Sequence, residues 1–174
     1  MNRIGSIIAP GAKLGLMYAE RLLAEVTGAN YARFARPGGV VVKSNHPAFI
    51  LGHLSLYPVR TMQNLNLPTG ATAVPPGYEA LFKFGVECQD DPDGKIYPPL
   101  AELKTQFFEG HKAAIAAVES AADEAFDGPN PAEGRLRELF PTIGTALNFY
   151  LIGHVQAHLG QFSAWRRAIG LPAA

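Results

Sequence analysis

Cysteine is nearly missing from this sequence, and its scarcity limits the possible chemistry. Cys88 is the single cysteine among 174 residues, so no disulfide can form within the chain. Because disulfides are rare in reducing compartments, one cysteine is compatible with a cytoplasmic protein, which is the location we expect. No second cysteine is available to share a metal with Cys88, and the simplest interpretation is a half-buried small side chain.

The sequence also has no excess of charge of either sign. Fifteen Lys and Arg balance fifteen Asp and Glu, and the basic residues form no stripe. Duplex nucleic acids are bound by clustered basic side chains that replace counterions, so we expect no nucleic-acid partner. Apolar residues make up 48% and charged residues 17% of the chain. These values are typical of a compact globular protein, and the length predicts one domain over residues 1–174.

Long hydrophobic runs are missing as well. No uncharged apolar run approaches the roughly 18 residues that span a bilayer, so we expect no membrane partner. The first apolar stretch follows a single basic residue, Arg3, and Pro10, Gly11 and Lys13 interrupt it. A secretory signal peptide normally has an uninterrupted apolar centre, so this N-terminus does not fit one.

The sequence contains four stretches with helical periodicity and little strand pattern. Apolar residues recur every three or four positions over about 11–31, 45–66, 101–125 and 140–169. Asn45 and Pro47 suit the start of the second stretch, and Pro58 should kink it. A long irregular segment, residues 67–97, separates the second stretch from the third. The expected fold class is therefore all-α, with the helices arranged as a four-helix bundle.

Two histidines lie on an apolar stripe of the last stretch, in FYLIGHVQAHLGQF (149–162). His154 and His158 are four residues apart, so a helix directs both rings toward one point inside the protein. Either a shared metal ion or two hydrogen-bonded core histidines would account for this pair. A zinc peptidase would require Glu where Val155 stands, and the Glu-x-x-His pairs of di-iron bundles do not occur.

His53 is the candidate for a third metal ligand. It lies in ILGHLSLY (50–57), again on an apolar helical stripe. Three histidines leave coordination positions open for water or substrate, an arrangement that is more typical of catalytic than of structural metal sites.

These two regions together resemble a known protein family. The motifs are Gly52-His53-Leu54 in the second stretch, and His154, His158, Gln161, Arg166-Arg167 and Gly170 in the last. They resemble the DinB-like (DinB/YfiT-like) superfamily, and the resemblance covers about residues 10–172. It implies a four-helix bundle with a long crossover loop between helices two and three. It also implies a homodimer, and nickel or zinc held by His53, His154 and His158.

The resemblance suggests an activity without naming a substrate. Characterised members of the family include transferases and isomerases that use a low-molecular-weight thiol. The expected function is therefore a metal site that activates a thiol or water, in a small-thiol-dependent transferase acting on a small molecule. A metal-dependent hydrolase and a non-catalytic, stress-associated metal-binding bundle remain as alternatives.

Further residues are weaker candidates for the site. Tyr57 lies one turn after His53, and Gln161 lies three residues after His158, so both are candidate catalytic residues. Gln161 could orient a ligand or a water, whereas an aromatic core position is the simpler interpretation of Tyr57. His111 lies on the stripe of the third stretch, where packing is the simpler interpretation.

His46 and Arg60 are candidate cofactor-binding residues. His46 lies two turns before His53, about 10 Å along a helix, which is too far to share its metal. It could line the mouth of the pocket, although a solvated position at a helix start is the simpler interpretation. Arg60, Arg166 and Arg167 could attract an anionic thiol, and solvated helix faces are their simpler interpretation.

Overall fold

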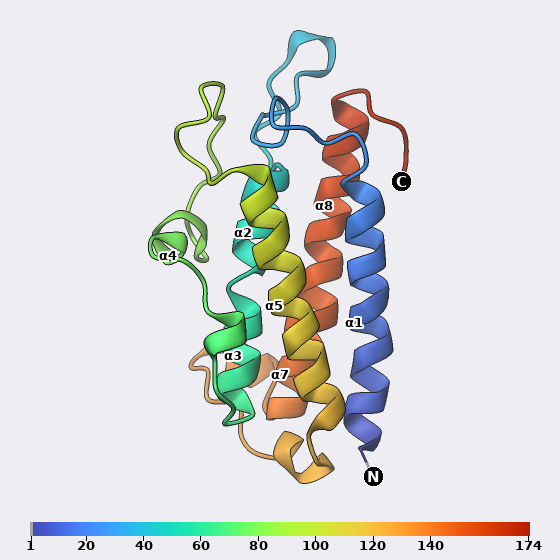
Figure 1. Cartoon of the computed structure of the whole chain (residues 1–174), viewed down its shortest axis with the longest axis vertical. Helices are drawn as coiled ribbons and strands as arrows, with labels where there is room; N and C mark the ends of the chain where they lie inside the picture. The colour runs from blue at the N-terminus through green and yellow to red at the C-terminus, as the bar shows by residue number, and fades with distance from the viewer. Residues whose placement is uncertain (1) are drawn as a thin grey trace.

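The structure, a computed structural model, describes residues 2–174 and is built of helices joined by loops (Figure 1). Among these residues there is no strand, only isolated bridges between Ala35 and Val42 and between Pro129 and Thr142. The expected all-α class is confirmed. The helices are α1 (Arg3–Leu22), α2 (Pro47–Leu54), α3 (Tyr57–Asn64), α4 (Tyr78–Phe82), α5 (Leu100–Ser120), α6 (Arg135–Leu139), α7 (Ile143–Asn148) and α8 (His154–Ala168), with 3-10 turns at Pro37–Gly39, Gly70–Thr72 and Asp123–Phe126 and a π-helix at Phe149–Gly153.

The long helices run side by side and enclose one core (Figure 1). Helix α1 packs against α5 and α8, α2 packs against the same two helices, and α3 packs against α5. Phe162 and Trp165 are buried in this core, as their positions on the apolar stripe predicted. Among residues 2–174, no helix is both long enough and apolar enough to cross a membrane.

Helix α1 begins earlier than the sequence pattern indicated. The periodicity predicts a helix over about 11–31, but the helix runs from Arg3 to Leu22 and contains Pro10. The Asn2 side chain caps it, and a carboxylate oxygen of Asp123 accepts hydrogen bonds from the N–H groups of Arg3 and Ile4. These contacts satisfy N–H groups that the first turn leaves free.

The second stretch forms two helices rather than one kinked helix. Pro58 lies in the first turn of α3, where its missing N–H is not needed. Helix α2 is capped by His46 and not by Asn45, because His46 Nδ1 accepts a hydrogen bond from the Phe49 N–H at 3.3 Å. The side chain of Asn45 instead reaches Gln161, near the metal-ligand candidates.

The last stretch is also interrupted. Instead of one helix over about 140–169, the chain forms α7, the π-helix Phe149–Gly153 and α8. Arg166 does not lie on a solvated face. Its side chain is buried and donates hydrogen bonds to the carbonyl oxygens of Leu22, Ala24 and Pro172. These bonds join the C-terminal ends of α1 and α8, whereas the neighbouring Arg167 is exposed as expected.

Candidate metal centre

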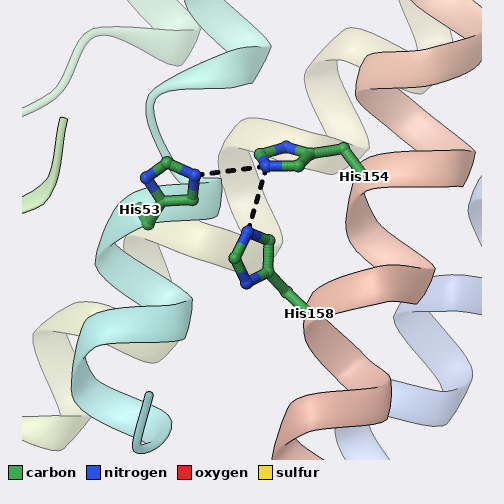
Figure 2. Close-up of side chains that lie close together, drawn as sticks. All are labelled: His53, His154 and His158. Atoms are coloured by element: carbon green, nitrogen blue, oxygen red, sulfur yellow. Dashed lines mark hydrogen bonds between the residues drawn. The ribbon is translucent and has the colours of Figure 1, made fainter. Parts of the chain in front are cut away.

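Three histidines from two helices converge on one point (Figure 2). His53 extends from α2, and His154 and His158 extend from successive turns of α8. His154 Nε2 lies 3.2 Å from His53 Nε2 and 3.0 Å from His158 Nε2. The predicted ligand set is therefore brought together, with one ligand atom from each residue within 4.8 Å of the others. This group could hold a metal ion.

Carbonyl oxygens determine which nitrogen of two of these rings is protonated. His53 Nδ1 lies 2.6 Å from the Phe82 carbonyl oxygen, and His158 Nδ1 lies 2.9 Å from Gln161 Oε1. Both oxygens accept hydrogen bonds, so each Nδ1 carries the proton and donates it. The Nε2 atoms of His53 and His158 consequently present lone pairs to the centre, which is the form that binds metals.

The contacts around His154 fit a shared cation. A neutral His154 carries at most one proton on Nε2, and that proton can serve only one of its two Nε2 neighbours. At least one contact would therefore join two lone pairs unless a cation lies between them. Two imidazole nitrogens bound to zinc at about 2.0–2.1 Å with a tetrahedral angle are roughly 3.3 Å apart, close to the observed separations.

Burial keeps the three imidazoles neutral. Desolvation lowers the pKa of His53 and of His158. Desolvation, followed by the charges of His158 and His53, lowers the pKa of His154 to about 3. Metal ligands must be deprotonated, so these shifts make the cluster ready to bind a cation at neutral pH.

A glycine in α2 allows Phe82 to approach the site. A Cβ atom added to Gly52 would lie 2.4 Å from ring atoms of Phe82, closer than van der Waals contact permits. Phe82, at the end of α4, is fully buried, and its carbonyl is the one that orients His53. The glycine preceding His53 therefore has a packing role. The sequence pattern did not predict that Phe82 would contact His53.

Tyr57 and Gln161 lie beside the histidines. The Tyr57 hydroxyl is 3.4 Å from His53 Nε2, and its ring centroid is 4.3 Å from that of His154. Gln161 Oε1 bonds His158 and also accepts from the Asn45 side chain at 3.0 Å.

His46 and Arg60 lie apart from the cluster. His46 is fully buried, and its Nε2–H donates to the Gln89 carbonyl oxygen at 2.7 Å, so the solvated interpretation is wrong. Arg60 lies over the Tyr57 ring and lines a different cavity of about 270 Å³, beside Tyr150. Neither residue lines the cavity that opens onto the three histidines.

His111 and Cys88 are packing residues, as expected. The His111 side chain is buried, and its Nδ1–H donates to the Phe107 carbonyl oxygen at 2.8 Å. Burial lowers the pKa of His111 to about 4. Cys88 is buried too, and desolvation raises the pKa of its thiol to about 11, which makes it a poor nucleophile.

A cavity of about 260 Å³ opens onto the three histidines. Its other lining residues are Asn45, Phe49, Lys83, Phe84, Gly85 and Val86. Four of these come from the turn after α4, inside the irregular segment 67–97, so part of that segment lines the site. A larger cavity of about 570 Å³ lies between α1 and α5, and none of the five histidines lines it.

Comparison of the chain with models of protein families, with curated proteins and with solved structures gives no match. The geometry of the histidine cluster and its cavity is therefore the basis on which a function can be proposed.

Proposed function

We propose that this chain is a metal-dependent enzyme of the DinB-like superfamily. In this proposal α1, α2 with α3, α5, and α7 with α8 are the members of a four-helix bundle, and residues 67–97 are its crossover loop. The contacts of α1 and α2 with both α5 and α8 support this arrangement. So do the Gly52-His53-Leu54 and His154-x-x-x-His158-x-x-Gln161 motifs.

The observation that carries the proposal is the convergence of three Nε2 atoms beneath an open cavity. His53, His154 and His158 would hold a divalent transition metal, nickel or zinc. When bound, such a metal lowers the pKa of a coordinated water or thiol and yields a nucleophile at neutral pH. Structural metal sites are closed by protein ligands, so the cavity favours a catalytic role over a purely structural one.

Tyr57 and Gln161 have different roles in this proposal. Burial raises the pKa of Tyr57, so its hydroxyl keeps its proton and can donate a hydrogen bond to a group bound beside His53 Nε2. Gln161 acts through His158, whose Nδ1–H it accepts, and is therefore a positioning residue. The Asn45 side chain holds Gln161 in place.

The reaction that we propose is transfer of a low-molecular-weight thiol to an electrophilic small molecule. The same residues could serve a hydrolase, and the two activities differ in whether turnover requires an added thiol. We also propose a homodimer. Three large apolar side chains on the outer surface of α1 support it, since Ile7, Leu14 and Met17 are 74%, 60% and 62% exposed.

The first experiment measures metal content by elemental mass spectrometry on protein purified without an affinity tag. We expect about one equivalent of nickel or zinc in the wild type and a loss of most of it in His154→Gln and His158→Gln. His46→Asn is the matched control, because it removes a buried histidine outside the cluster and keeps a side chain that can cap α2.

A wild-type protein that takes up neither added nickel nor added zinc would contradict the proposal. If metal is present, thiols and electrophiles are screened together and separately. Turnover only with both supports the transferase, turnover of an ester or lactone without thiol supports the hydrolase, and no turnover supports a non-catalytic protein.

A further inference from the structure

A tight turn, residues 83–86, lines the cavity that opens onto the three histidines. The Val86 N–H donates to the Lys83 carbonyl oxygen at 3.1 Å, and Gly85 has a φ of +89°. These are features of a type II turn, in which the third residue needs a positive φ and is usually glycine. Phe84 occupies the second position, and its side chain is 91% exposed.

The two phenylalanines of this short segment differ sharply in burial. Phe82 is fully buried and orients His53, whereas Phe84 is the most exposed large apolar residue among residues 2–174. Burying an aromatic ring is favourable, so an exposed ring beside a cavity offers binding energy to a ligand that covers it. The turn is also anchored, because it directly follows α4, whose last residue is packed against α2.

The charge at the mouth of the cavity is positive. Among residues 2–174, Lys83 is the only charged residue that lines the cavity, since the histidines are neutral, and it takes part in no ion pair there. None of the carboxylates in the described part of the chain lines the cavity. A bound divalent cation would add to the positive potential, so the mouth favours an anionic group.

The volume limits the size of the ligand. The cavity has a volume of about 260 Å³. It is smaller than the range of about 300–1,000 Å³ that is usual for drug-sized ligands. Phe49 and Val86 add apolar surface to the wall beside Phe84.

We propose that Lys83 and Phe84 form a specificity-determining mouth that selects a small carboxylate with a flat apolar body. Lys83 pairs with the carboxylate, and the Phe84 ring covers the apolar part above the three histidines. This inference rests on the proposed metal-dependent function, because the metal centre is what the bound molecule would reach.

The test uses benzoate and its neutral analogue benzamide as probes, titrated into zinc-loaded protein by calorimetry. We expect benzoate to bind at least fivefold more tightly than benzamide. Lys83→Gln should weaken benzoate binding about three- to fivefold, as expected for a solvent-exposed ion pair, and should bring benzoate close to benzamide. Phe84→Ser should weaken both probes about tenfold, because both lose the apolar contact.

Lys112→Gln is the matched control, since Lys112 is an exposed lysine on α5 that lines a different cavity. Lys83 and Phe84 are exposed, so their substitution should not impair folding. Equal effects of Lys83→Gln and Lys112→Gln, or equal affinities for benzoate and benzamide, would overturn the proposal.

The metal-free protein separates this inference from the proposed function. If the wild type takes up no metal, the proposed function fails in the elemental analysis alone. The same titration on metal-free protein then decides the role of the mouth. Lys83-dependent benzoate binding would support it, and its absence would refute it.

Discussion

The three histidines of the candidate metal site are not held equally firmly. His53 donates to a backbone carbonyl, that of Phe82, and His158 donates to the side chain of Gln161. His154 Nδ1 is buried without a hydrogen-bond partner in residues 2–174, so the ring is positioned by its aromatic neighbours and by the contacts of its Nε2 with His53 and His158. A side-chain acceptor can be removed by substitution, which makes Gln161 the residue at which the orientation of a ligand can be tested directly.

Gln161→Leu should lower the affinity for zinc about 10- to 100-fold, because His158 loses the acceptor that fixes its tautomer. Gln161→Glu keeps an acceptor at the same place and should retain most of the affinity. The measurement is a competition titration with a chromophoric zinc chelator. Gln156→Leu, on the same helix but outside the cavity, is the control and should leave the affinity unchanged.

At the scale of elements, the site depends on the contact between α2 and α4. Gly52 leaves room for the Phe82 ring, and the Phe82 carbonyl oxygen accepts the hydrogen bond from His53 Nδ1. A second local feature lies just before the other two candidate ligands, where the π-helix Phe149–Gly153 leads directly into His154. An extra residue in a helical turn changes the direction of the side chains that follow, and π-helical turns are frequent at functional sites.

Gly52→Ala should destabilise the fold by about 1–3 kcal/mol, because the new methyl group overlaps the Phe82 ring and forces repacking. It should also weaken zinc binding, since moving Phe82 moves the acceptor of the His53 proton. Urea unfolding and the zinc competition titration measure the two effects.

The control for that substitution is Gly160→Ala on α8, where an added Cβ meets nothing within 4 Å. Alanine there should stabilise the protein by about 0.5–1 kcal/mol through its higher helix propensity. If both substitutions had the same effect on stability, the role assigned to the Gly52–Phe82 contact would be wrong.

For the whole molecule, buried neutral histidines make the free energy of unfolding depend on pH. The folded-state pKa of His111 is about 4, below the ordinary value of 6.5 that applies in the unfolded chain. Between these values the unfolded chain binds more protons than the folded protein does. The free energy of unfolding is therefore unaffected by His111 above pH 6.5, and it falls as the pH drops from 6.5 toward 4.

The contribution of His111 can be isolated with His111→Leu, which is close in size and does not titrate. When the pH is lowered from 7.5 to 5, the free energy of unfolding of the metal-free wild type should fall by about 2 kcal/mol more than that of the variant. Urea unfolding at both pH values measures this difference. The other histidines titrate in both proteins, so an identical loss in the two would show that burial of His111 does not contribute to acid sensitivity.

The sequence by itself determined the all-α class and the three candidate ligand histidines. Helical periodicity depends on residues three and four apart, so it predicted the all-α class, and it placed His154 and His158 on one face. His53 required a comparison of two stretches, because each of them carried histidine on an apolar stripe. Proline and glycine marked the long segment 67–97, which contains the turn over the site.

Only the tertiary structure decided the contacts between segments. Asp123 supports the start of α1, and buried Arg166 bonds carbonyls at the end of that helix, although both partners lie far away along the chain. The contact of Phe82 with His53 and the position of Lys83 at the cavity mouth also depend on segments that are distant in the sequence. Local pattern records which side of a helix is apolar, but which distant group satisfies a given donor depends on how the helices pack.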